Sequence, residues 1–292
     1  MRPWRSSVPA PASASKPTMP TLRLEGADCH YSDAGEGPVL VLIHGLGASQ
    51  ADWFTQLPAF ERQYRCIAPD LTGHGGSSPD GPYDIFAQAR RLFALLDALG
   101  VQQAHVLGHS MGGAVAQSMA LVAPERVRSL TICNSTAGFR PTTPKKLLEA
   151  VSRVALVGTL GVQPLAGLIA YRLFPHADQA DLRRTMRAHF AQGSRPVYLR
   201  SLFALGRWSI WHRLADIACS TLVIAAEHDY FPLAETQRLV EGIPDAQLQV
   251  FPGSRHGTPM DRAEAFNTRV LEFLAAARGP VQAPPLGEAA PA

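Results

Sequence analysis

The pentapeptide at residues 108–112, Gly-His-Ser-Met-Gly, restricts how this chain can fold more than any other stretch. The apolar pair Val106 and Leu107 precedes it, and the Ala/Val/Leu-rich segment 113–122 follows it. The first pattern is typical of a buried strand and the second of a helix, so the pentapeptide predicts a sharp turn between them. Glycine is needed at both ends because a Cβ there would crowd the backbone of the turn. Ser110 then stands at the apex, with its hydroxyl clear of the sheet.

Strand-like and helical patterns alternate on both sides of this turn. Residues 39–43 form a continuous run of Val, Leu and Ile, which is typical of a strand buried on both faces. Residues 64–68 and 127–132 are further strand-like runs, and Asp84 can cap a helix that ends before Gly100. This alternation predicts a mostly parallel sheet with helices on both faces.

The alternation fails in the middle of the chain. Helical patterns occupy residues 142–157, 178–189 and 201–214, and no strand-like run separates them. The sheet resumes at residues 221–225, and the capping-box spacing from Asp261 to Glu264 predicts a last helix. An insertion placed after a parallel strand covers the sheet edge where open α/β sheets bind ligands.

The chain therefore divides into a core, an insertion and two tails. The tails are rich in Pro, Ala and Ser, a composition that predicts disorder. The expected divisions are disordered tails over 1–20 and 279–292, a core over 21–133 and 219–278, and a helical cap over 134–218.

Composition and spacing exclude several classes of partner. A net charge of +3 with scattered Lys and Arg gives no case for nucleic-acid binding. The uncharged segment 154–171 has the length of a membrane span, but its glycines and Pro164 are expected to break it into two short helices. No zinc spacing, phosphate loop or dinucleotide motif occurs, so we predict no cofactor and no metal. The oligomeric state cannot be predicted from these patterns.

The placement of the cysteines indicates the cellular compartment in which the protein works. The chain has four cysteines, Cys29, Cys66, Cys133 and Cys219, and they share no metal-ligand spacing. Three of the four lie in or beside apolar strand-like runs. Buried reduced thiols are the better interpretation, ahead of a disulfide framework. This usage predicts a cytoplasmic protein.

Five short patterns together point to one family. They are His44-Gly45, residues 70–77 (Asp-Leu-Thr-Gly-His-Gly-Gly-Ser), residues 108–113, Asp229, and His256 within residues 253–257. With them, residues 21–277 resemble the α/β-hydrolase superfamily, except over much of the cap. The likeness is greatest to its small esterase, lactonase and carbon–carbon-bond hydrolase members. It implies a mostly parallel, doubly wound eight-stranded sheet with a helical cap insertion. Dehalogenases and epoxide hydrolases of this fold have aspartate where Ser110 stands, so neither chemistry is expected.

The candidate catalytic residues follow the order serine, acid, histidine that this fold uses. A serine hydroxyl is a weak nucleophile at neutral pH, so Ser110 needs a base, and His256 follows the last strand at the same sheet edge. A carboxylate must orient that imidazole and stabilise its protonated form. Both Asp229 and Glu227 follow the strand at 221–225, and Asp261 is a weaker third candidate because it already has an expected capping role. The resemblance favours Asp229.

An oxyanion formed at Ser110 needs two hydrogen-bond donors, and we assign them to the backbone amides of Met111 and Leu46. Other polar residues near the motifs are expected to be structural. His44, His74 and Asp70 shape the glycine-rich loops, and His109 packs beside the turn.

Two function classes remain open. The first is a serine hydrolase that cleaves a small to medium-sized apolar carboxylic ester or lactone through an acyl-enzyme. Carbon–carbon-bond hydrolase, acyltransferase and perhydrolase activities are variants that use the same three residues. The second class is a ligand receptor that retains them. The sequence cannot separate these activities, because water, alcohol and peroxide compete for the same acyl-enzyme.

The cap bears on the substrate. It is rich in Leu, Phe and Trp, which predicts an apolar pocket over Ser110 and a small-molecule apolar ester as the partner. Its basic residues in helical stretches are expected to face water rather than to bind an anion: Lys145, Lys146, Arg183, Arg184 and Arg187.

Overall fold

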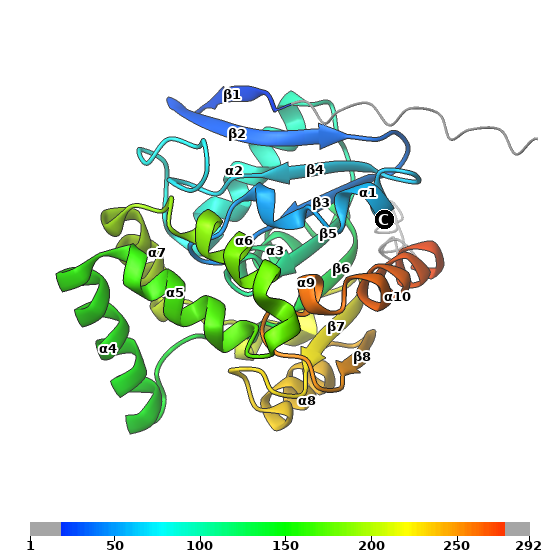
Figure 1. Ribbon diagram of the computed structural model, residues 1–292. Coiled ribbons are helices and arrows are strands. Elements are labelled where there is room, and N and C mark those ends of the chain that lie inside the picture. The colour runs from blue at the N-terminus through cyan, green and yellow to red at the C-terminus, as the bar shows by residue number, and fades with distance from the viewer. Residues whose placement is uncertain (1–18, 278–292) are drawn as a thin grey trace, which may run out of the picture.

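A single eight-stranded sheet runs through the centre of the molecule (Figure 1), in a computed structural model that describes residues 19–277. The strand order is β1-β2-β4-β3-β5-β6-β7-β8. β2 is antiparallel to both of its neighbours, and the pairs from β4 through β8 are parallel. The strands are β1 (Thr21–Leu24), β2 (Ala27–Ala34), β3 (Val39–Ile43), β4 (Arg65–Pro69), β5 (Ala104–His109), β6 (Val127–Cys133), β7 (Ser220–Ala226) and β8 (Ala246–Phe251). This is the sheet that the resemblance implied. Disordered tails were expected over 1–20 and 279–292, and residues 1–18 and 279–292 of these tails lie outside the described residues.

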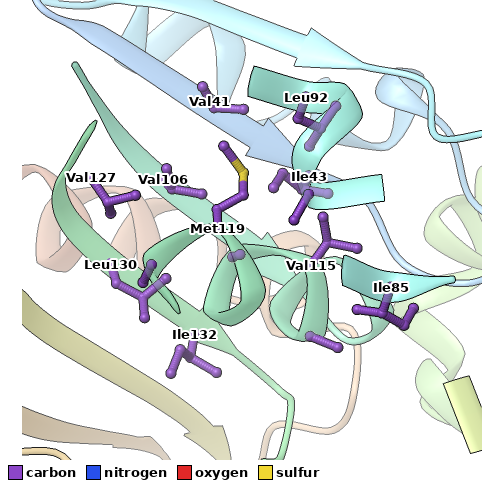
Figure 2. Close-up of a cluster of buried hydrophobic side chains, with 14 of the residues drawn as sticks. Val41, Ile43, Ile85, Leu92, Val106, Val115, Met119, Val127, Leu130 and Ile132 are labelled. Atoms are coloured by element: carbon purple, nitrogen blue, oxygen red, sulfur yellow. The ribbon is translucent and has the colours of Figure 1, made fainter. Parts of the chain in front are cut away.

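Helices cover both faces of the sheet, because the strands are apolar on both sides. In β3, Val41 and Ile43 face one hydrophobic cluster, and Leu40 and Leu42 face another. The first cluster is closed by α2 (Ile85–Ala98), α3 (Met111–Val122) and α8 (Leu233–Gly242). Figure 2 shows its centre, where Val115 and Met119 of α3 lie among side chains from β3, β5 and β6. The opposite face packs against α1 (Leu57–Phe60) and α10 (Ala263–Ala276), whose Phe60 and Phe266 are fully buried.

Between β6 and β7 the chain forms helices that gather at one end of the sheet (Figure 1). They are α4 (Pro144–Leu160), α5 (Val162–Leu173), α6 (Ala180–Phe190) and α7 (Arg195–Arg207). These helices share a small core of their own, built around Phe174, Phe190 and Leu165. We call them the cap helices. Leu205 of α7 already packs on the main core, and the chain continues on it from Trp208, before the expected end of the cap at 218.

The ends of several cap helices differ from those expected. α7 begins at Arg195 rather than at 201, because Ser194 caps it and Pro196 lies in its first turn. After Arg207 a separate 3-10 helix, Trp211–Asp216, packs on the main core. The apolar segment 154–171 is broken at Gly161, whose φ is 82°, and not at Pro164, which lies in the first turn of α5.

The capping role expected for Asp261 is wrong. Asp261 is the last residue of the short helix α9 (Thr258–Asp261), and α10 follows Arg262 without a side-chain cap. The Asp261 carboxylate instead accepts a hydrogen bond from Ser254 Oγ at 2.9 Å. Asp261 therefore ties α9 to the loop that carries His256.

The structure also bears on the membrane span and on the cysteines considered in the sequence. Across residues 19–277, no helix is both long enough and apolar enough to cross a membrane. All four cysteines are buried and free.

Candidate active site

Ser110 lies at a tight turn between β5 and α3. Its backbone has φ 54° and ψ −115°, a conformation that residues other than glycine rarely adopt. The turn brings α3 so close to β5 that a Cβ on Gly108 would overlap the carbonyl oxygen of Gly112. A Cβ on Gly112 would in turn overlap the carbonyl oxygen of Ile43 on β3. Glycine at both positions is therefore required, as the sequence predicted.

His256 and Asp229 meet Ser110 in one chain of hydrogen bonds. The distance from Ser110 Oγ to His256 Nε2 is 2.9 Å, and His256 Nδ1 lies 2.6 Å from Asp229 Oδ1. An ionised carboxylate can only accept, so the imidazole proton belongs on Nδ1 and Nε2 is free to accept from the serine. The structure thus brings together the three residues that the sequence singled out.

Glu227, the alternative acid, lies elsewhere. Its carboxylate accepts a hydrogen bond from the Gly253 amide at 2.8 Å and supports the loop before His256. The Asp229 carboxylate is almost fully buried and accepts from Asn134 Nδ2 at 2.6 Å through its second oxygen. Burial alone would raise the pKa of Asp229, but the positive charge and hydrogen bond of His256 and the bond from Asn134 bring it below its ordinary value. Asp229 therefore stays ionised beside the imidazole.

Two further residues of this site, Asn134 and Tyr230, were not predicted from the sequence. Asn134 follows the last residue of β6 and has φ 47°, so the chain turns there to aim its amide at Asp229. The Tyr230 ring lies against His256, with centroids 4.5 Å apart. Asn134 could have been found by the rule that found Asp229, since both follow the carboxyl end of a parallel strand. Apart from its position next to Asp229, nothing in the sequence pattern pointed to Tyr230 as a residue of the site.

His109 packs against His256, with ring centroids 5.1 Å apart. Its Nε2 donates to the His256 carbonyl oxygen at 2.8 Å, which fixes the backbone of the histidine loop. Burial, together with the neighbouring His256, lowers the pKa of His109 to about 3. A histidine held neutral in this way positions the loop without adding charge.

The glycine-rich loops are held by the residues expected to shape them. His44 Nε2 accepts from the Leu71 amide at 3.0 Å, and its Nδ1 donates to the Gly45 carbonyl at 2.8 Å. The Asp70 carboxylate accepts from the backbone amides of Gln50 and Gly76. Burial lowers the pKa of His74 to about 3, so its neutral Nε2 accepts from the Gly47 amide at 3.3 Å. These bonds fix the loop that carries Leu46.

The amides of Leu46 and Met111 are free to bind an anion. Among the described residues neither N–H has a hydrogen-bond acceptor. Met111 is the first residue of α3, where amide groups point out of the helix and the dipole favours negative charge. The backbone before Leu46 lies against Ser110, since a Cβ on Gly45 would come within 3.3 Å of the serine Cβ.

Ser110 opens into a cavity of about 840 Å³ between the sheet and the cap helices. Apolar side chains of the cap line much of it, including Leu156, Leu165, Leu168, Ile169 and Phe190. No three His, Cys, Asp or Glu side chains of residues 19–277 come close enough to hold a metal ion. The site can bind an apolar molecule and expose one of its carbonyl groups to an oriented serine.

The family model for the alpha/beta hydrolase fold matches residues 38–263 of this chain. The chain belongs to this family. It is 33% identical to a putative carbamate hydrolase, RutD, of Azorhizobium caulinodans, over 87% of this chain and 98% of the relative. It is 30% identical to the 2-hydroxy-6-oxo-6-phenylhexa-2,4-dienoate hydrolase of Burkholderia cepacia, over 84% and 91%. The crystal structure of the enol-lactonase from Burkholderia xenovorans LB400 superposes with a TM-score of 0.80 at 27% identity, covering 88% of this chain and all of that one.

All three relatives are named as hydrolytic enzymes, but their names give different substrates. One is named for a carbamate, one for a dienoate and one for a lactone. Membership therefore identifies this chain as an α/β hydrolase, and the nature of its substrate has to be argued from the site itself.

Proposed function

We propose that this α/β hydrolase cleaves small to medium-sized carboxylic esters or lactones with apolar groups, through an acyl-enzyme on Ser110. The observation that carries the proposal is the hydrogen-bond chain from Ser110 through His256 to Asp229 at the base of an apolar cavity. A triad of this kind is recognised by its geometry and roles.

In the proposed reaction, Ser110 Oγ attacks the substrate carbonyl and passes its proton to His256 Nε2. Asp229 stabilises the imidazolium, and the amides of Leu46 and Met111 bind the oxyanion. The imidazolium then protonates the leaving alcohol, which departs from an ester and stays attached in a lactone. Water, deprotonated by the same imidazole, attacks the acyl-enzyme and releases the acid. A purified sample that turns over p-nitrophenyl butyrate supports this class, and one that binds the ester without turnover supports a receptor.

Carbon–carbon cleavage is the second candidate, because the Burkholderia cepacia relative is named a hydrolase of a phenyl-substituted oxohexadienoate. The two candidates separate in one experiment, in which p-nitrophenyl esters, lactones and aromatic ring-cleavage products are assayed in parallel. A kcat/KM that is highest for a ring-cleavage product would replace the ester proposal. Cytoplasmic location and acyl transfer stay predictions from the sequence.

The oxyanion assignment predicts that Leu46→Pro lowers kcat by about 10²–10³, the loss seen when one oxyanion donor is removed. Proline has no N–H to donate, whereas Leu46→Ala keeps the amide and removes only side-chain packing. The comparison of the two variants, with circular dichroism to confirm folding, isolates the amide. Equal losses in the two variants would contradict the assignment.

Met111→Ala is expected to keep most of the activity, because its proposed contribution is also the backbone amide. Its side chain is fully buried in the main core, so stability should fall by about 2–5 kcal/mol, measured by denaturant unfolding. A large loss of kcat at unchanged stability would show that the side chain itself takes part in the reaction.

The apolar lining predicts a dependence on acyl chain length. Burying one methylene group contributes about 0.8 kcal/mol, so kcat/KM should rise up to about fourfold per methylene from acetyl to butyryl or hexanoyl p-nitrophenyl esters. Leu168→Ser should flatten this rise because Leu168 lines the cavity, and Leu160→Ser should not, because Leu160 is an exposed leucine of the cap outside it. A preference for acetate in the wild type would contradict the prediction.

A further inference from the structure

The cavity over Ser110 is lined by more basic than acidic side chains. Its basic residues are Arg140, Lys146, Arg153, Arg172 and Arg207, and its acidic residues are Asp52 and Glu149. Asp52 is already paired with His189, 2.6 Å away, and Lys146 is paired with Glu235 at 2.9 Å. The remaining charges give the cavity a positive field, which favours an anionic ligand. Of the five basic cap residues expected to face water, Lys146 lines this cavity, and it is paired with Glu235. Arg153 and Arg172 were not among those five.

Arg153 is the basic residue best placed to act on the substrate. It comes from α4, and its guanidinium carbon lies 5.7 Å from the ring centroid of Tyr230. The Tyr230 ring lies in turn against His256. In the part of the chain that the structure describes, Arg153 forms no ion pair with a carboxylate. A guanidinium that rests on an aromatic face keeps its N–H groups available to a second partner.

Tyr198 supplies a second unused donor in the same cavity. This residue of α7 is 2% exposed, and its hydroxyl has no hydrogen-bond partner among residues 19–277. Burial raises the pKa of Tyr198, while the positive charge of Arg153 and the approach of its N–H groups to the phenol oxygen act in the opposite direction. The hydroxyl therefore stays protonated at neutral pH and can donate. Arg153 can only donate, so the proton of the Tyr198 hydroxyl still lacks an acceptor among the described residues. A buried hydroxyl without an acceptor is unusual, and at a functional site it marks a place for a ligand atom.

We propose that Arg153 and Tyr198 form a subsite for a carboxylate, so that the substrate is an ester or lactone that also carries a free carboxylate. This inference rests on the proposed hydrolysis at Ser110. The guanidinium supplies charge and N–H donors to the carboxylate, and the tyrosine hydroxyl donates to it as well. The apolar walls between this subsite and Ser110 hold the methylene groups that join the carboxylate to the reacting carbonyl. Substrate is thus oriented by one charged contact at the cap and by the serine at the sheet.

The test compares anionic esters with their neutral methyl esters. Monomethyl adipate carries its carboxylate on the acyl side, and 4-butanoyloxybutanoate carries it on the alcohol side. Product release is followed by liquid chromatography. We expect wild-type kcat/KM to be higher for the anionic member of at least one pair, mainly through a lower KM.

The variants then assign that preference to residues. Arg153→Met should lower the ratio of anionic to neutral kcat/KM by about 10–100-fold, as expected for a charge-assisted hydrogen bond. Tyr198→Phe should lower it by about three- to tenfold, the loss of a neutral hydrogen bond. Arg187→Met is the matched control, since Arg187 is an exposed arginine of the cap that does not line the cavity, and it should leave the ratio unchanged. The subsite is ruled out by a wild type without preference, or by an Arg153→Met variant that keeps it.

Failure of the hydrolase proposal would look different, because no ester of either kind would then be turned over. The subsite is still tested in that case by calorimetric titration of Ser110→Ala with monomethyl adipate and with dimethyl adipate. We expect the anionic ester to bind more tightly, and Ser110→Ala with Arg153→Met to bind it about 10–100-fold more weakly. Equal binding of the two esters, or no binding of either, would overturn the subsite.

Discussion

Replacement of Ser110 by alanine is expected to lower kcat for p-nitrophenyl butyrate by about 10⁶, the cost of removing the nucleophile of a serine hydrolase triad. The covalent route depends on one oxygen, which lies 2.9 Å from His256 Nε2. The same change should shift Tm by no more than a few degrees, because Ser110 is only half-buried and its Oγ has no other hydrogen bond among the described residues. Steady-state kinetics and a thermal melt on the same preparation measure the two effects.

Ser135→Ala is the matched control for this variant. Ser135 Oγ donates to the Ser110 carbonyl oxygen at 2.7 Å, so the control removes a neighbouring serine hydroxyl that does not contact His256. We expect at most a tenfold loss of kcat, about the value of one neutral hydrogen bond. Comparable losses in the two variants would mean that the turn, and not the Ser110 oxygen, sets the rate.

Asp229→Asn should lower kcat by about 10⁴, as the equivalent change does in a serine protease. The Asp229 carboxylate accepts from two side-chain donors at 2.6 Å, His256 Nδ1 and Asn134 Nδ2, and its Oδ1 also accepts from the Tyr230 amide at 2.5 Å. An asparagine at this position has one carbonyl oxygen for these two donors. When that oxygen serves Asn134, the new amide faces His256 and favours the tautomer with its proton on Nε2. That tautomer cannot accept the serine proton.

Glu227→Gln is the control, because it neutralises the other carboxylate near the end of β7. Its oxygen can still accept from the Gly253 amide, so the histidine loop keeps its support. We expect kcat within a few-fold of wild type, measured on the same ester. The reverse ranking of Asp229→Asn and Glu227→Gln would assign the acid to position 227.

The strands of the core could be predicted from the sequence because each one is buried on both faces. A strand such as β3 must then be apolar at every position, and that pattern is easily told from its surroundings. The glycines at 108 and 112 were equally clear, since close backbone contacts admit no other residue. The fold and the turn that carries Ser110 were therefore both within reach of local reasoning.

The ends of the cap helices were harder to predict, because an amphipathic helix can begin at any of several polar residues. α7 starts at Arg195 through Ser194 and Pro196, a cap and first-turn signal that the apolar spacing alone does not show. Asp261 had the spacing of a cap, but its hydrogen bond to Ser254 engages the carboxylate elsewhere. Tertiary contacts outweighed local preference in both places.

The charges of the cavity could not be predicted at all. Whether Arg153 faces water or Tyr230 depends on how α4 packs beside the triad, and the sequence of α4 does not encode that direction by itself. The same holds for Tyr198, which became a candidate only when its hydroxyl proved to be buried without a partner. The chemistry of the triad is local to the strand ends, while the recognition of substrate depends on the packing of the cap.

The most direct test of the account is covalent labelling with a fluorophosphonate, which phosphonylates an activated serine, followed by mass spectrometry. An oriented serine paired with His256 should take up one phosphonate per chain, and peptide mapping should locate it on Ser110. Ser110→Ala should not be labelled. Labelling that persists in Ser110→Ala, or that maps to a different residue of the wild type, would contradict the assignment of Ser110 as the nucleophile.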